Sequence, residues 1–378
     1  MNELRLEVSV DDQVLRVFRD TELVRSYPVS TAAKGVGFTP GSHRTPTGRF
    51  VIAQKAGAGE PPGTIFVSRK VVGHWQPGDA SEKDHVLTRI IRLSGLQPEN
   101  ANSFDRYIYL HGTNHEAKLG SPASCGCVRL ANADVTELYN LVEPGMIVEI
   151  LPPVRPRGKL AFFDCDSTLS SIEGIDELGR ARGPEVFAMV EHLTNAAMNG
   201  EVPIGEVFGR RMEIIRPDRA TADAVAQLYV DTMVPGTAEV IVDLKRKGWT
   251  PVILSGGFEP LIRPLAKVLG IDHVEAVPLY FDPEGNYAGY GNSYPTTRNG
   301  GKPEVVREWK QATLPEAVIM MGDGISDLEA KPEVDLFIGF GGVVARKPVQ
   351  EGADAWLTSM AGFAHVDLPV GPRASSRV

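Results

Sequence analysis

One short segment constrains this chain more than any other: residues 163–169, FDCDSTL, at the end of the apolar run 160–163. The run predicts a short buried strand, and strand alternation turns Asp164 and Asp166 toward the same side at its end. Buried like charges repel, so they must be paired, protonated or bound to a cation. A divalent ion would resolve the conflict, and a carboxylate beside such an ion can attack a phosphoryl group. Taken alone, the segment also fits an Asx-rich turn that caps a helix.

The composition is that of a globular protein and excludes several classes of partner. The 378 residues are 42% hydrophobic and 23% charged, which indicates two or three domains. Residues 1–152 hold 16 basic and 17 acidic side chains, whereas residues 153–378 hold 23 and 31. We expect no nucleic-acid partner, because phosphate backbones require a basic surface. We also expect no membrane insertion, because no apolar run approaches the about 20 residues that span a bilayer.

The first residues and the cysteines indicate a cytoplasmic protein. Residues 1–8, MNELRLEV, alternate between polar and apolar side chains and do not form a basic stretch followed by an apolar one. The three cysteines, Cys125, Cys127 and Cys165, are too few and too closely spaced for a disulfide framework.

The amino-terminal part is predicted to be a mostly-β domain over residues 1–151. Short alternating runs separated by turn signals predict its strands, for example residues 4–10 and 14–18. A helix is expected over residues 135–142, capped by Asn132 or Asp134. Residues 152–158 contain three prolines and predict a semi-rigid linker.

The pattern beyond the linker changes to strands that alternate with helices over residues 159–367. This pattern is typical of a Rossmann-like, mainly parallel sheet with helices on both faces. The prediction depends on buried strands expected at residues 252–254 and 318–321 and on helices expected at residues 259–269 and 302–311. Residues from about 178 to 234 are helical in pattern and are predicted to form a helical cap, and residues 368–378 a mobile tail.

A possible thiol site lies in the first domain. A thiolate is a nucleophile that needs a neighbouring base, and Cys127 and His111 offer this pair, although a lone cysteine is more often a small buried hydrophobe. The ordered motifs of residues 4–151 resemble the YkuD-type L,D-transpeptidase family: Thr45-Pro-Thr-Gly48, His111-Gly-Thr113, Ser124-x-Gly126-Cys127-x-Arg129 and Asn132-x-Asp134.

The resemblance implies that Cys127 is the nucleophile and His111 the general base. It further implies that Ser124, Gly126 and Arg129 line a site for a peptidoglycan-derived peptide. Cys125 stands where the family often has histidine. Members of the family without an export signal resemble L,D-carboxypeptidases, so we favour this reaction over cross-linking. A non-catalytic muropeptide sensor is the alternative.

A second set of motifs, over residues 159–360, resembles the haloacid dehalogenase superfamily and, within it, the phosphoserine phosphatases. The resemblance implies that Asp164 attacks a small phosphomonoester to form an aspartyl-phosphate, while Asp166 acts as acid and base. Mg²⁺ is expected between Asp164, the Asp166 backbone carbonyl and Asp323, with Asp327 in support. The remaining implied phosphate contacts come from Ser255, Gly256 and Lys302.

The substrate prediction depends on Glu173 and Arg211. Each alone is typical of a solvated helix charge. Their positions match the phosphoserine phosphatase residues that meet the substrate ammonium and carboxylate, which favours O-phospho-L-serine. The fusion to a muropeptide-trimming domain instead suggests a recycling intermediate, N-acetylmuramic acid 6-phosphate, or a phosphatase regulated by the first domain.

Overall fold

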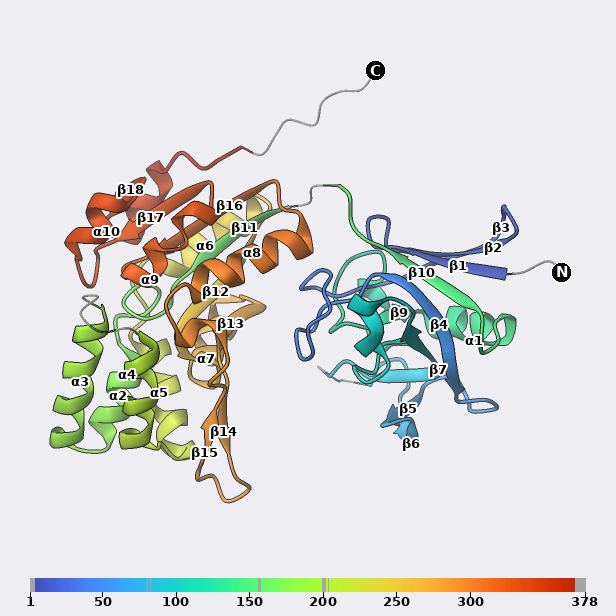
Figure 1. Ribbon diagram of the computed structural model, residues 1–378, viewed down its shortest axis with the longest axis horizontal. Helices are drawn as coiled ribbons and strands as arrows, with labels where there is room; N and C mark the ends of the chain where they lie inside the picture. The colour runs from blue at the N-terminus through green and yellow to red at the C-terminus, as the bar shows by residue number, and fades with distance from the viewer. Residues whose placement is uncertain are drawn as a thin grey trace. The chain divides into compact units, whose positions relative to one another are not determined.

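The structure is a computed structural model that describes residues 4–79, 81, 83–155, 158–198, 202 and 204–370. It divides into two compact units, one of residues 1–156 with 311–314 and one of residues 157–310 with 315–378 (Figure 1). The end of the predicted tail, residues 371–378, lies outside the described residues. In the described ranges, no helix is both long and apolar enough to cross a bilayer.

The first unit is built on one sheet, which confirms the predicted mostly-β fold. The sheet has the order β3-β2-β1-β10-β4-β7-β5-β6, with β8 paired to β7 and β9 paired to β8. Its strands are β1 (Leu4–Ser9), β2 (Val14–Arg19), β3 (Glu22–Pro28), β4 (Gly48–Ala56), β5 (Thr64–Val67), β6 (Lys70–His74), β7 (Val86–Gly95), β8 (Tyr109–Gly112), β9 (Val128–Leu130) and β10 (Ile147–Leu151).

The helix α1 (Asn132–Leu141) packs on this sheet through Val135 and Leu138, both fully buried. The predicted cap was wrong: the residue at the N-cap is Ala131, and no side chain caps the helix. Asn132 instead donates its side-chain amide to the carbonyl oxygen of Thr113 at 2.9 Å. It therefore ties the start of α1 to the segment that follows β8.

The second unit is a parallel six-stranded sheet with the order β13-β12-β11-β16-β17-β18. Counted along the chain, this is the order 3-2-1-4-5-6 of a Rossmann-type sheet, so the predicted fold class is confirmed. The strands are β11 (Lys159–Phe163), β12 (Trp249–Phe258), β13 (His273–Val277), β16 (Ala317–Gly322), β17 (Leu336–Phe340) and β18 (Ala355–Leu357).

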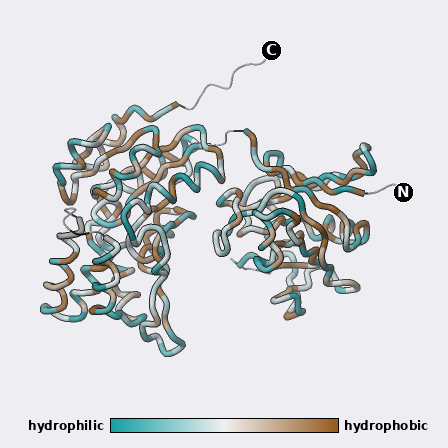
Figure 2. The backbone as a smooth tube through the Cα atoms, in the orientation of Figure 1, coloured by the Kyte–Doolittle hydropathy of each residue, from teal (hydrophilic) through white to brown (hydrophobic). Residues whose placement is uncertain are grey.

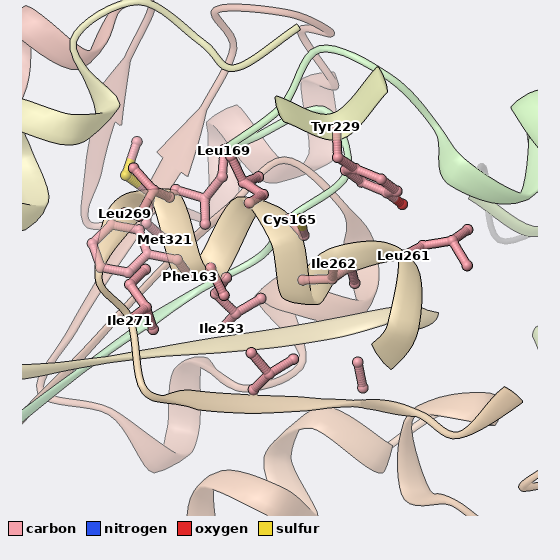
Figure 3. Close-up of a cluster of buried hydrophobic side chains, with 14 of the residues drawn as sticks. Phe163, Cys165, Leu169, Tyr229, Ile253, Leu261, Ile262, Leu269, Ile271 and Met321 are labelled. Carbon is pink, nitrogen blue, oxygen red and sulfur yellow. The ribbon is translucent and has the colours of Figure 1, made fainter. Parts of the chain in front are cut away.

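Alternation along the central strand builds a core on each face of this sheet. Ala161 and Phe163 join a cluster with residues of α6 (Thr237–Arg246) and α7 (Glu259–Leu269). Leu160 and Phe162 point to the other face, where they pack with α8 (Gly301–Thr313) and α10 (Lys347–Gly352). Figure 3 shows part of the first cluster, with Phe163 beside Ile253. Figure 2 shows how hydrophobic and hydrophilic residues are distributed along the backbone.

Four helices between β11 and α6 form the cap, and they lie together in Figure 1. They are α2 (Gly174–Ala181), α3 (Pro184–Met198), α4 (Ile204–Ile215) and α5 (Arg219–Asp231). The first of them begins four residues before the predicted start of the cap. The chain also forms a hairpin of β14 (Leu279–Phe281) and β15 (Tyr287–Tyr290), and the short helix α9 (Ile325–Leu328) contributes Ser326 and Asp327 to the site.

Candidate active sites

The first candidate site lies where the strand order of the parallel sheet reverses. Asp164 follows β11 and Asp323 follows β16, and these strands are neighbours with Phe163 opposite Met321. The crevice outside the carboxyl ends of strands at such a reversal is where open α/β sheets bind ligands. The sheet therefore brings together two carboxylates that are far apart in sequence.

Asp327 completes a buried acidic trio with Asp164 and Asp323. One oxygen from each lies within 4.8 Å of the others, and all three residues are buried. Asp327 is positioned by α9, and its Oδ2 accepts the N–H of Gly324 at 2.9 Å. Residue 322 must be glycine, because a Cβ there would lie 2.3 Å from the Asp327 carboxyl carbon.

Burial and mutual repulsion make this trio electrostatically unfavourable. Burial, reinforced by the neighbouring carboxylate Asp327, raises the pKa of Asp164 well above its usual value and that of Asp323 to about 6. Hard carboxylate oxygens at this spacing are ligands that Mg²⁺ prefers. The trio therefore fits a divalent cation.

Lys302 is the fixed cation of this site. Its Nζ donates to Asp164 Oδ1 at 2.7 Å and to Asp327 Oδ1 at 2.5 Å, and only 5% of its side chain is exposed. Burial alone would lower the pKa of Lys302, but Asp164 and Asp327 outweigh this effect and raise it. The ammonium is therefore charged and aimed at the nucleophile that the sequence predicted.

Asp166 is held apart from the acidic trio by three donors. Its Oδ1 accepts the N–H of Gly174 at 2.7 Å and the hydroxyl of Tyr229 at 2.6 Å. Its Oδ2 accepts the hydroxyl of Ser255 at 3.0 Å. Ser255 was predicted to bind phosphate, and in this structure its hydroxyl donates its hydrogen bond to Asp166. Gly256 and Gly257 line the cavity instead.

Glu173 and Arg211 lie on the cap side of the same cavity. Burial raises the pKa of Glu173 to about 8, and Ser167 donates its hydroxyl to this carboxyl at 2.7 Å. Arg211 is 5% exposed, donates Nη1 to Thr194 at 2.9 Å, and its Nε has no partner among the described residues. Burial lowers the pKa of Arg211. A guanidinium in a cavity wall with an unpaired N–H is suited to a substrate carboxylate.

Sequence reasoning missed Arg346. This arginine stands directly before α10, and its Nε donates to Asp323 Oδ2 at 3.2 Å. Its Nη2 lies 3.9 Å from Glu173 Oε1, so it links the acidic trio to the cap-side carboxylate. The segment 341–346, GGVVAR, carries no recognisable local signal for this role.

The cavity between these groups is small, about 60 Å³. Its polar wall comes from the acidic trio, Asp166, Lys302 and Arg211, and Ile175 and Phe208 supply apolar surface. The lining therefore offers cations for a phosphate and a carboxylate, and acidic groups for a metal ion and an ammonium.

The second candidate site lies on β8 and β9 of the first unit. His111 pairs with Arg129 across these parallel strands, so the side chains of His111 and Cys127 emerge on the same face. Cys127 donates its thiol to the carbonyl oxygen of Tyr107 at 3.3 Å. His111 Nδ1 lies 2.7 Å from the carbonyl oxygen of Gly112, which fixes Nδ1–H and leaves Nε2 as the acceptor.

Both members of this pair are uncharged at neutral pH. Burial raises the pKa of Cys127 to about 11 and lowers the pKa of His111. The site therefore holds a neutral thiol and a neutral imidazole, an arrangement in which the imidazole can accept the thiol proton during attack.

The loop before Cys127 is held by hydrogen bonds to Ser124 and Thr45. Ser124 Oγ donates to the Cys127 carbonyl oxygen at 2.6 Å, and Thr45 Oγ1 donates to the Gly126 carbonyl oxygen at 2.9 Å. Gly126 has φ +125°, a conformation that only glycine adopts without strain. Ser124 is 3% exposed, so it shapes the loop rather than forming an open wall.

Arg129 is the register partner of His111 on β9 and is held by two side-chain acceptors. It is 1% exposed, and its guanidinium donates to Asp84 Oδ2 at 3.0 Å and to Ser30 Oγ at 2.8 Å. These contacts hold Arg129 in place, and its predicted role in lining the substrate site stays a prediction. Asp84, which sequence reasoning missed, also accepts the hydroxyl of Thr113 at 3.0 Å, and so ties the end of β8 to Arg129.

Comparisons with known proteins agree with this division. Residues 3–150 match the L,D-transpeptidase catalytic domain family (YkuD), and residues 161–330 match the haloacid dehalogenase-like hydrolases. Mouse phosphoserine phosphatase is 36% identical over 198 residues, which cover 52% of this chain and 87% of that protein. The chloroplastic phosphoserine phosphatase of Arabidopsis thaliana is 35% identical over 234 residues, covering 60% and 78%.

Among solved structures, a phosphoserine phosphohydrolase-like protein from Francisella tularensis aligns with a TM-score of 0.50 at 26% identity. The alignment covers 55% of this chain and 98% of that one. The chain therefore belongs to the phosphoserine phosphatase family of haloacid dehalogenase-like hydrolases, and it carries an L,D-transpeptidase catalytic domain at its amino-terminal end.

Proposed function

We propose that the second unit hydrolyses a phosphomonoester through an aspartyl-phosphate on Asp164. The observation that carries this proposal is the position of Asp164 at the sheet reversal, 2.7 Å from the Lys302 ammonium and next to the buried carboxylates of Asp323 and Asp327. A carboxylate in such surroundings is a nucleophile whose attack on phosphorus is assisted by fixed positive charge.

The reaction has two steps. Asp164 attacks the phosphorus, the ester P–O bond breaks, and Asp166 gives its proton to the departing alkoxide. Asp166 then accepts a proton from water, whose oxygen attacks the aspartyl-phosphate and releases inorganic phosphate with Asp164 restored. Asp164, Asp323, Asp327 and the Asp166 backbone carbonyl would hold Mg²⁺, which when bound supplies positive charge to the phosphoryl oxygens.

The favoured substrate is O-phospho-L-serine, which would be hydrolysed to L-serine. Arg211 offers donors for its carboxylate, and Glu173 offers an acceptor for its ammonium. N-acetylmuramic acid 6-phosphate could offer its lactyl carboxylate to Arg211, but it has no free ammonium for Glu173.

The test compares kcat/KM for these two compounds in the wild type and in Glu173→Ala. We expect the wild type to prefer phosphoserine, and Glu173→Ala to lose that preference by at least about tenfold, since the substitution removes the carboxyl group proposed to accept a hydrogen bond from the substrate ammonium. A strong preference for the sugar phosphate, unchanged by the substitution, would contradict the choice of substrate.

We further propose that the first unit is a cysteine L,D-carboxypeptidase for peptidoglycan stem peptides. The supporting observation is that Cys127 and His111 share one face of β8 and β9. The thiol sulfur attacks the peptide carbonyl while His111 takes the thiol proton and passes it to the leaving D-alanine amine. Water then hydrolyses the thioester and restores the thiol.

Two measurements test the first unit. We expect purified protein to release D-alanine from a tetrapeptide muropeptide, whereas formation of cross-links in place of release would indicate a transpeptidase. A carbapenem should acylate the wild type and not Cys127→Ser. Muropeptide binding without any acylation would support the alternative, a sensor domain that regulates the phosphatase.

A further inference from the structure

Tyr229, on the cap helix α5, reaches the acid–base group of the core. The residue is fully buried, and its hydroxyl donates to Asp166 Oδ1 at 2.6 Å. Figure 3 shows its ring beside the buried apolar cluster, with the hydroxyl oxygen directed away from Leu169 and Cys165. A buried tyrosine hydroxyl is expected to have a polar partner, and here that partner is the group proposed to move the catalytic proton.

The same carboxylate oxygen receives a second donor from the start of the cap. The backbone N–H of Gly174, the first residue of α2, donates to Asp166 Oδ1 at 2.7 Å. A Cβ on Gly174 would lie 2.0 Å from the Tyr229 hydroxyl oxygen. Glycine at this position therefore leaves the space in which both donors can reach one oxygen.

The two oxygens of Asp166 are consequently not equivalent. Oδ1 faces the Gly174 amide, which can only donate, and the Tyr229 phenol, which donates to it here. A proton on Oδ1 would therefore meet the amide hydrogen and would require the phenol to turn away. In the part of the chain that the structure describes, Oδ2 accepts a hydrogen bond from the Ser255 hydroxyl alone, at 3.0 Å, and a hydroxyl can turn to accept as well as donate.

We propose that Tyr229 is a positioning residue that, together with Gly174, keeps the transferable proton of Asp166 on Oδ2. This inference depends on the proposed phosphatase mechanism. In the first step the Oδ2–H bond breaks and the proton goes to the leaving alkoxide. In the second step Oδ2 takes a proton from water. Tyr229 keeps its own proton throughout, and the contact comes from the cap helix α5.

The experiment compares two leaving groups in Tyr229→Phe, which removes only the hydroxyl. Serine leaves as a basic alkoxide that needs a proton, whereas 4-nitrophenolate leaves without one. kcat/KM reports the first, phosphoryl-transfer step, so we expect it to fall about tenfold for phosphoserine and to stay within about twofold for 4-nitrophenyl phosphate. Gly174→Ala, which displaces the hydroxyl, should give the same selective loss.

An equal loss with both substrates, accompanied by a lower Tm, would show a purely structural role and overturn the proposal. No loss with either substrate would overturn it as well. Asp166→Asn distinguishes this failure from failure of the proposed function. If Asp166→Asn loses phosphoserine turnover selectively while Tyr229→Phe does not, Asp166 is the acid and Tyr229 does not position it. If Asp166→Asn shows no selective loss, the assignment of Asp166 itself is wrong.

Discussion

The two candidate sites treat charge in opposite ways. The phosphatase site concentrates buried carboxylates around Lys302 and Arg346, whereas the thiol site holds Cys127 and His111 in their neutral forms. Phosphoryl transfer involves a substrate that is itself an anion, so fixed cations are needed before chemistry begins. The amide carbonyl that the thiol attacks is uncharged and develops charge only during the reaction, so a neutral pair with a proton acceptor in place is sufficient.

The strongest test of this contrast removes the phosphatase nucleophile. Asp164→Asn should lower kcat/KM for phosphoserine by at least about 10³-fold, since the substitution removes the carboxylate proposed to attack phosphorus. Carbapenem labelling of Cys127 should be unchanged in this variant. The exposed Asp272 gives a matched control, and Asp272→Asn should keep both activities. If Asp164→Asn kept a tenth of the wild-type turnover, Asp164 could not be the nucleophile.

Removal of divalent cations should separate the two sites next. Chelation with EDTA should abolish turnover of phosphoserine and leave acylation of Cys127 intact. Adding Mg²⁺ should restore turnover and raise the Tm of the second unit, because a ligand at 100 times its Kd stabilises the folded state by about 2.7 kcal/mol. Asp327→Asn should lose this shift in Tm. An equal shift in that variant would place the ion elsewhere.

The pH dependence of alkylation tests the neutral thiol. Because burial raises the pKa of Cys127 to about 11, its thiolate fraction should increase about tenfold per pH unit from pH 7 to 10. Site-resolved mass spectrometry with iodoacetamide should therefore show no plateau below pH 10, with Cys127→Ser as the background. A plateau near pH 7 would indicate a pre-formed thiolate and remove the contrast between the sites.

The smallest expected effect concerns the loop that carries the thiol. Thr45 donates to the Gly126 carbonyl oxygen and accepts the N–H of Ala32 at 2.9 Å. Thr45→Val keeps the shape and leaves both backbone groups unpaired, at a cost of about 1–3 kcal/mol in the free energy of unfolding. Calorimetry should show this loss in the transition that does not respond to Mg²⁺. Thr45→Ser, which retains the hydroxyl, should lose less.

The sequence predicted the parts of each site that depend on local pattern. The buried run before Asp164 and the alternation of β8 are local features, so the strand-end aspartates and the position of His111 followed from them. Arg346, Asp84 and Tyr229 reach their partners only through folding, from loops or helices that carry no motif. For Ser255, the sequence predicted the position near the end of a strand. It could not predict which group the hydroxyl contacts, because that depends on where folding places Asp166.

Lys302 has a consequence for handling the protein. A tethered ammonium cannot be dialysed away, so it continues to neutralise Asp164 and Asp327 when small ions are stripped from solution. Preparations depleted of metal should thus remain folded. They should regain full phosphatase turnover when a magnesium salt is added, with no denaturation and renaturation cycle.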